Sequence, residues 1–536
     1  MRPRLEGYEV PELPKLAWVA TVDLHSSRVR VFHGSAVERG RGWLVEGVWD
    51  GDFAAGGFHR TAQFFGSGIR IEEDAVYFVP SSALTDRLFS CRTDQSLVVA
   101  NSLCLLLAYT GARLDPEHDY HRESQAIRQG LRAYDSTFHV RHPALDRFEQ
   151  VYYHRLVVSR GTVTRETAPA PAAIPSFTHY EHLLGETLAR IAANAASPRR
   201  RAPLALCATV SAGYDSPAVA ALVKDLGVEA CFTAYRSSSS IPAWLNPQAV
   251  IDDGTPVAAA LGLAVRPLGT PRSQVTEDEL YFLAACASMP ALAFHSMARD
   301  IERSGRVALV FTGFQGDYVW DVNVETKHLN DDFTGCDTSG VTLSEIRLKS
   351  GFINAAVPFL FARAIPDLAL IGASVEMAPW RSRPDYDRPI ARRIAEAAGV
   401  PRAAFGQSKR AVIAAYDYPV HPVLRGAFLA QLAAEGIRPV RVYLQSAANR
   451  VLYTVARALA AARRAFTGIG ERTPHALVGK RLDLPRRLFV WAGDALADRL
   501  AAVLPARDVA APPAAVRSAP AAVPHAPSHA PAVSSR

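Results

Sequence analysis

Apolar and polar residues alternate in short runs along the first third of the chain. The clearest runs cover residues 18–22, 29–32, 75–79 and 96–100, and glycine, aspartate and serine separate them. Alternation of this kind between turn-forming residues is typical of strands that bury one face. We therefore expect a mostly β region from residue 17 to about 165.

The pattern changes after residue 177. Continuous apolar runs at 204–210, 229–235 and 307–312 predict buried strands, and the segments between them have helical spacing. Strands that alternate with helices are typical of a parallel, doubly wound sheet, which binds ligands at the carboxyl ends of its strands. Each run leads into polar or glycine-containing residues there. We therefore expect an α/β fold.

Helical spacing continues through residues 420–503. One face carries the apolar residues Leu452, Val455, Leu459 and Phe466. Arginines lie elsewhere on the helical wheel, at Arg457, Arg463 and Arg464. A basic amphipathic helix can lie on a membrane surface or pack on its own domain. We expect packing on the domain and no membrane contact.

The composition limits the number of domains, the compartment and the partners that we expect. The chain has 536 residues, of which 49% are hydrophobic, so we expect more than one domain. No apolar run is long enough to span a bilayer, and the first residues lack the apolar stretch of a secretory signal. Six scattered cysteines without a C-x-x-C pair argue for the cytoplasm and against structural zinc. The net charge of +7 is spread along the chain, so we expect no nucleic-acid partner.

The changes in pattern divide the chain into five parts. We expect a β-rich domain at 1–167, an Ala/Pro-rich linker at 168–176, an α/β domain at 177–420, a helical appendage at 421–503 and a tail at 504–536. The tail is rich in alanine, proline and serine and cannot bury a core, so we expect it to be disordered.

The turn after the first buried strand of the α/β domain contains the strongest candidate ligand-binding residues. Its residues are Val210, Ser211, Ala212, Gly213, Tyr214, Asp215, Ser216 and Pro217. A strand, a short hydroxyl-bearing turn and a helix that opens on proline form a phosphate site, because the first helical N–H groups lack partners. Asp215 would repel phosphate without a divalent cation between them, so we interpret it as a magnesium ligand.

A second such turn follows the strand at 307–312. It contains Gly313, Gly316 and Asp317, which suit a close approach to a nucleotide and a second metal-ligand carboxylate. Together, the two turns resemble the S-G-G-x-D-S and S-G-x-G-x-D-E motifs of the class B asparagine synthetase family of ATP pyrophosphatases. Ala212 stands where that family has glycine, and Tyr318 stands where it has glutamate.

The resemblance implies a fold and a set of ligands. It implies an Ntn-hydrolase-like α+β domain followed by a PP-loop ATP pyrophosphatase domain of the adenine nucleotide alpha hydrolase type. It implies ATP and Mg²⁺ as cofactors, with Asp215 and Asp317 as metal ligands. The residues expected to bind ATP or pyrophosphate are Val210, Ser211, Gly213, Asp215, Ser216, Thr233, Ala234, Thr312 and Gly313.

Two more segments resemble the family. Residues 373–380 place Glu376 on its general-base glutamate, and residues 405–411 place Lys409 on the lysine that stabilises the transition state. A structural ion pair for Glu376 and an exposed loop position for Lys409 stay open. Asp252 and Asp253 match the family's acidic pair, or they cap the helix that follows.

The N-terminal part resembles the family's glutaminase domain through residues 86–92 and 97–106. That domain uses an N-terminal cysteine as its nucleophile, whereas residue 2 here is Arg2 and the first cysteine is Cys91. We therefore expect no glutamine hydrolysis. Lasso-peptide cyclases and β-lactam synthetases share this loss.

The expected activity is AMP-forming carbon–nitrogen ligation. A small-molecule or peptide carboxylate would be adenylated and passed to an amine or ammonia, as in macrolactam formation, with a precursor peptide or partner protein as a further partner. Two alternatives stay open: an asparagine synthetase that uses ammonia, and a tRNA-modifying PP-loop enzyme or catalytically dead binding protein.

Overall fold

The computed structural model describes residues 3–505 except 27, 94, 169–170, 236–251, 270–271, 288–289, 337, 383–385, 408–415 and 468–481. Side chains are not described at 453–454 and 456–467. Nearly all of the tail expected to be disordered, 504–536, lies outside these residues.

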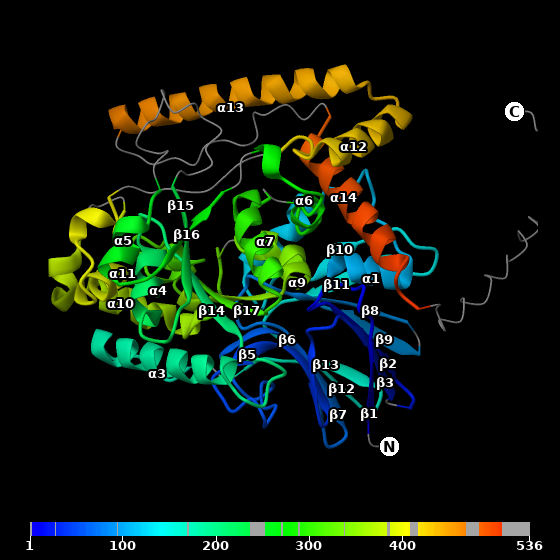
Figure 1. Cartoon of the computed structure of the whole chain (residues 1–536), viewed down its shortest axis with the longest axis horizontal. Coiled ribbons are helices and arrows are strands. Elements are labelled where there is room, and N and C mark those ends of the chain that lie inside the picture. Colours follow the sequence, from blue (N-terminus) through cyan, green and yellow to red (C-terminus); the bar gives the residue numbers. More distant parts are fainter. Residues whose placement is uncertain are drawn as a thin grey trace, which may run out of the picture. The chain divides into compact units, whose positions relative to one another are not determined.

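The N-terminal region is built from two sheets (Figure 1). One has the order β1 (Arg4–Glu9), β3 (Arg28–His33), β2 (Trp18–Asp23), β9 (Ser96–Ala100), β8 (Leu88–Arg92), β11 (Arg147–Val151) and β10 (Thr137–His139). The other has the order β13 (Thr162–Glu166), β12 (Arg155–Ser159), β7 (Ala75–Val79), β6 (Phe64–Glu72), β5 (Trp43–Trp49) and β4 (Glu38–Gly40). Neighbouring strands are antiparallel except β1 and β3, which are parallel. The four strands expected from alternation are confirmed as β2, β3, β7 and β9.

The two sheets pack through the residues that alternation selects. Trp18 and Val29 from one sheet share an apolar cluster with Ile69 and Phe78 from the other, and each is buried. The residues that alternate with them point to the opposite faces, as the two-residue period of a strand requires, and there Val19 and Val45 belong to other apolar clusters. The N-terminal sheets therefore form a sandwich with one shared core.

The third sheet is parallel throughout. Its order is β16 (Val265–Leu268), β15 (Ala230–Ala234), β14 (Ala205–Thr209), β17 (Ala308–Thr312) and β18 (Phe352–Ala356). The predicted strands at 204–210, 229–235 and 307–312 are confirmed as β14, β15 and β17. The chain is thus mixed α/β, with a parallel sheet beside antiparallel ones.

Both faces of β14 are covered, which explains its continuous apolar sequence. Leu206 and Ala208 belong to the cluster that includes α3 (Phe177–Ala195) and α4 (Asp215–Val223). Ala205 and Cys207 belong to the cluster on the other face, with α7 (His295–Ser304). The remaining helices of this region are α5 (Thr255–Ala260), α6 (Glu279–Ala284), α8 (Gly316–Val319), α9 (Ser344–Ser350), α10 (Ile365–Ala373) and α11 (Pro389–Ala397).

A buried ion network joins the sandwich to the parallel-sheet region. Arg347 of α9 donates to Glu46 of β5 at 2.8 Å and to Asp86 at 2.7 Å, and all three side chains are at most 5% exposed. Burial raises the pKa of Asp86 to about 6, although Arg347 opposes this shift. Because a buried charge needs its partner, the network fixes the register between the two regions.

The C-terminal region is helical, as expected, with α12 (Pro422–Ala434), α13 (Pro439–Thr467) and α14 (Leu484–Ala501). Helix α14 packs against α1 (Leu103–Thr110) in an apolar cluster that also includes residues of α12, and α2 (Tyr120–Ser124) lies beside it. None of the described helices is long and apolar enough to cross a membrane.

Candidate functional site

The predicted phosphate turn lies where the order of the parallel sheet reverses. From β14 the chain moves outward through β15 and β16, and then returns to place β17 on the other side of β14. The helices that follow β14 and β17 on the way to their next strands, α4 and α9, pack in apolar clusters on opposite faces of the sheet, and a doubly wound sheet typically binds ligands in the crevice at such a point. The turns at 210–214 and 313–315 lie on the two sides of this point, and we call them the walls of the crevice.

Two glycines allow these walls to touch. A Cβ atom on Gly313 would lie 2.7 Å from the backbone nitrogen of Ser216, and one on Gly316 would overlap the carboxyl group of Asp215. Gln315, between them, has a φ of 68°, a left-handed conformation that is uncommon outside glycine. The two glycines noted in the sequence therefore bring Asp215 against the turn that carries Asp317.

The turn after β14 brings together the hydroxyl groups predicted to bind phosphate. Ser211 Oγ and Ser216 Oγ are 2.9 Å apart, and the backbone N–H of Gly213 donates to Ser211 Oγ at 3.2 Å. Helix α4 starts at Asp215, and no side chain of the described residues caps it. The start of α4 thus combines two hydroxyl donors with uncapped backbone N–H groups, which is the chemistry of an anion site.

The carboxylate of Asp215 is largely buried beside an arginine, with 19% of the side chain exposed. Its Oδ2 accepts a hydrogen bond from Arg388 Nη1, and Arg388 Nε lies 3.5 Å from Asp321 Oδ2. Oδ1 of Asp215 is buried and has no hydrogen-bond partner among the described residues. Burial raises the pKa of Asp215 to about 6; Arg388 opposes the shift, and Asp317 adds to it by charge repulsion.

Asp215 and Asp317 could together hold a magnesium ion. Carboxylate oxygens are the ligands that Mg²⁺ prefers, and it commonly uses one or two of them together with phosphate oxygens. The unsatisfied Oδ1 of Asp215 fits such a ligand set. Within the described chain no three His, Cys, Asp or Glu side chains gather into a complete metal site, so the phosphates would have to complete it. In this structure Arg388 supplies the positive charge.

The acidic pair after β15 orders the turn. Asp252 Oδ1 accepts the backbone N–H of Ala212 at 3.2 Å, and Asp253 Oδ1 accepts that of Thr255 at 2.9 Å. The contact of Asp253 favours the capping interpretation, since Thr255 is the first residue of α5. Ala212 is not among the described residues with a positive φ, so its position does not need the glycine of the family motif.

The other predicted nucleotide residues support the strand ends. Thr233 Oγ1 accepts the backbone N–H of Gly254 at 2.8 Å, and Thr312 Oγ1 donates to Asn354 Oδ1 at 2.8 Å. The backbone N–H of Val210 donates to the carbonyl of Phe232 at 2.8 Å, and Ala234 is buried at the end of β15. These residues hold the walls of the crevice in place.

The sequence reasoning missed the segment from Tyr386 to Arg392. The ring of Tyr386 lies 4.7 Å from that of Tyr214, and Arg392 Nη2 donates to the hydroxyl of Tyr214. Ser382 Oγ lies 2.9 Å from the same hydroxyl. With Arg388 on Asp215, this segment braces the phosphate turn from the side of α11. In the sequence, only the closeness of Arg388 to Tyr386 could have drawn attention to this segment.

Residues 405–407 lie against the same turn. The backbone N–H of Gly406 donates to the carbonyls of Ala212 and Gly213 at 2.9 and 3.2 Å. Gly406 has a φ of 66°, and a Cβ there would overlap the ring of Tyr214, so the position requires glycine. Lys409 follows three residues later and lies outside the described residues, as does Arg410.

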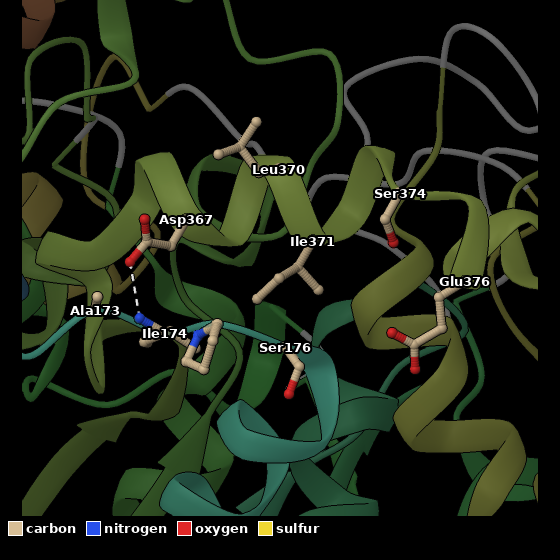
Figure 2. Close-up of a pocket in the computed structure, with 9 residues that line it drawn as sticks. Ala173, Ile174, Ser176, Asp367, Leu370, Ile371, Ser374 and Glu376 are labelled. Atoms are coloured by element: carbon tan, nitrogen blue, oxygen red, sulfur yellow. Dashed lines mark hydrogen bonds between the residues drawn. The ribbon is translucent and has the colours of Figure 1, made fainter.

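Glu376 lies in a different setting. It belongs to the 3₁₀ segment Val375–Trp380, its side chain is half exposed, and its Oε1 accepts from Arg393 Nη1 at 2.6 Å. Figure 2 shows it at one end of a cavity of about 350 Å³ between α10 and the segment that enters α3. At the other end, Asp367 accepts the backbone N–H of Ile174 at 2.8 Å. The residues of the phosphate turn do not line this cavity.

Fold and site together define a mixed α/β protein whose parallel sheet has its switch point between β14 and β17, beside the start of α4. No protein-family model matches the chain, and no curated protein shows significant similarity to it.

Because Arg388 pairs with Asp215, we expect Arg388→Met to lower the free energy of unfolding by an amount that depends on pH. Removing one partner of a buried ion pair typically costs about 3–5 kcal/mol, and we expect a loss at the lower end in urea unfolding at neutral pH. The pKa of Asp215 is raised in the folded state, so its ionisation lowers stability as pH rises through about 6. Without Arg388, the ionised Asp215 destabilises the fold more strongly. The loss of stability caused by Arg388→Met should therefore shrink at pH values below the pKa of Asp215, where this carboxyl group is protonated.

Two controls accompany this measurement. Asp215→Asn added to Arg388→Met removes the stranded charge and should recover part of the stability. Arg306→Met breaks an exposed ion pair with Glu229 and should change stability little at either pH. An Arg388→Met loss that is equal at both pH values, or that Asp215→Asn does not relieve, would contradict the role of this pair.

Proposed function

We propose that the protein is an AMP-forming carbon–nitrogen ligase of the asparagine synthetase type. ATP adenylates a carboxylate and releases pyrophosphate, and an amine or ammonia then displaces AMP to form an amide. The observation that carries the proposal is the contact of Asp215, at the start of α4, with the glycine turn that follows β17. This contact lies at the switch point, where a doubly wound sheet binds its ligands.

The arrangement of the sheets supports the finer fold assignment. A sandwich of two antiparallel sheets precedes a five-stranded parallel sheet, as expected for an Ntn-hydrolase-like domain followed by a PP-loop ATP pyrophosphatase domain. The short turn between β14 and α4 has the length and the hydroxyl groups that a pyrophosphate loop needs.

In the proposed site, uncharged donors would bind the phosphates and carboxylates would bind the metal. Ser211 and Ser216 would donate hydroxyl hydrogen bonds to pyrophosphate, and the N–H groups at the start of α4 would add to them. Asp215 and Asp317 would hold magnesium, which neutralises phosphate charge when bound. Arg388, which pairs with Asp215 and is attracted electrostatically to Asp317, would keep the two carboxylates from repelling one another and the nucleotide.

Lys409 is proposed to stabilise the charge that develops on the α-phosphate and on the attacked carbonyl oxygen. The contact of Gly406 with Ala212 and Gly213 supports this, because it ties the start of the 405–411 segment to the phosphate turn. For Glu376, the ion pair with Arg393 favours the structural interpretation. A general-base role would require its carboxylate to exchange Arg393 for the amine.

The nitrogen source follows from the first domain. Cys91 is buried in the sandwich region, and burial raises the pKa of its thiol to about 12. A thiol with such a pKa supplies almost no thiolate at neutral pH, so it makes a poor nucleophile. The amine of the second substrate, or free ammonia, is therefore the proposed nucleophile.

Binding of a non-cleavable ATP analogue tests the site without knowledge of the carboxylate. We expect α,β-methylene-ATP with magnesium to bind to the full chain in a calorimetric titration. Asp317→Asn removes one proposed metal ligand and should weaken binding about tenfold or more, since charge-assisted contacts contribute about 1.5–3 kcal/mol each. Asp321→Asn removes an equal charge beside Arg388 and should leave the affinity nearly unchanged. Equal effects of the two changes would refute the assignment of Asp317.

The absence of glutaminase activity is a separate expectation. The protein should release no glutamate from glutamine, with or without ATP, because Cys91, the first cysteine of the sequence, is buried. A coupled glutamate assay measures this, with Cys91→Ala as the matched variant. Release that persists in Cys91→Ala would reveal another nucleophile, and release that disappears would mean that Cys91 itself reacts.

A further inference from the structure

Helix α13 (Pro439–Thr467) has an unusual distribution of charge. Its sequence contains neither aspartate nor glutamate. Its charged residues are all arginines, at Arg441, Arg450, Arg457, Arg463 and Arg464. At 1.5 Å per residue the helix is about 44 Å long, and in Figure 1 it runs along the upper edge of the view.

The first turns of α13 fix which face looks toward the body. Val442 and Ser446 are buried. The ring of Tyr443 lies 5.3 Å from that of Tyr418, and Asn449 Nδ2 donates to Asp417 Oδ1 at 3.2 Å. Residues 442, 446 and 449 follow one another at intervals of four and three, so they mark one stripe of the helix.

The larger apolar side chains are exposed, and all of those named next except Leu452 lie on the opposite face. Val440, Leu444 and Val451 are 58%, 66% and 63% exposed, and Leu452 and Val455 are 43% and 50% exposed. The helix thus packs on the body as expected, but not through the predicted face, since Leu452 and Val455 are exposed; the side chains of Leu459 and Phe466 lie outside the described ones. Polar contacts and two small buried side chains dock the helix, which leaves its apolar stripe outside.

Such a stripe differs from the scattered apolar residues of an ordinary surface. Single exposed apolar side chains are normal, whereas a contiguous row marks a binding surface. At 100° per residue, Arg441 and Arg450 fall on opposite sides of this row, but Arg450 Nη2 donates to Tyr418 Oη at 3.1 Å and to Ser446 Oγ at 3.4 Å, on the side that faces the body. An apolar stripe next to Arg441, on a helix with no acidic residue, suits an anionic surface that has an apolar interior beneath it.

We propose that α13 binds the surface of an anionic lipid bilayer. The apolar stripe enters the boundary between headgroups and acyl chains, and Arg441 reaches the lipid phosphates while its methylene stem stays on the apolar side. The helix lies in the plane of the membrane, in keeping with the finding that no described helix could cross one. A bilayer fits better than a protein groove because an anionic surface is complementary to a helix whose charged residues are all arginines, and a flat surface can meet the exposed row from Val440 to Val455.

Flotation of the full chain with vesicles tests this proposal. We expect binding to vesicles of phosphatidylcholine mixed with phosphatidylglycerol, and little binding to phosphatidylcholine alone. Leu444→Gln with Val451→Gln should weaken binding at least about tenfold, because each change removes an inserted apolar group. Arg441→Gln should weaken it about fivefold, and high salt should weaken it further.

The matched control is Val375→Gln with Val423→Gln. These residues are 92% and 62% exposed, lie outside α13, and should leave vesicle binding unchanged. Equal binding to neutral vesicles, or full binding by the Leu444→Gln/Val451→Gln variant, would overturn the proposal. So would the absence of vesicle binding together with a dimer that this variant converts to a monomer, because a second copy would then cover the stripe. ATP-analogue binding should be unaffected by all of these changes. The vesicle experiment therefore tests the membrane proposal independently of the proposed ligase activity.

Discussion

The largely buried carboxylate of Asp215 constrains the turns around it. It needs a positive partner because burial removes most of its water, and Arg388 provides one from a segment 173 residues away in the chain. It also needs room, which Gly313 and Gly316 provide by having no side chain. The turn after β14, the turn after β17 and the start of α11 are thus held together by a single group. That group is also the proposed ligand of the metal.

The ion pair gives the site two states that differ in charge partner. Without a ligand, Arg388 pairs with the carboxylate of Asp215, and Asp252 accepts a hydrogen bond from the backbone N–H of Ala212. A nucleotide with its cation would compete for the same carboxylate and for the N–H groups of the turn. Part of the binding energy would then be used to displace these contacts. The raised pKa of Asp215 adds a second limit, because protonation below about pH 6 would remove the charge that a metal needs.

Local signals predicted the core of the fold and half of the site. Strands β14, β15 and β17 could be read from continuous apolar runs because helices cover both of their faces. β16 escaped notice because Arg266 and Pro267 interrupt its short run, and β18 because it is a brief stretch that includes Asn354. Asp215 and Asp317 stood out because each follows a strand within a few residues. Arg388 could not be predicted, since its role depends only on tertiary contact. The outward face of α13 was also hidden, because a helical period does not reveal which face is covered.

A crystal structure with magnesium and α,β-methylene-ATP tests the central claim most directly. The β- and γ-phosphates should lie within hydrogen-bond distance of Ser211 Oγ and Ser216 Oγ, with the cation between them and Asp215. Arg388 should have moved away from Oδ2 of Asp215 or come to share it with the cation. A nucleotide bound outside the crevice, such as in the cavity beside Glu376, or phosphates remote from the start of α4, would contradict the assignment of this turn as a pyrophosphate site.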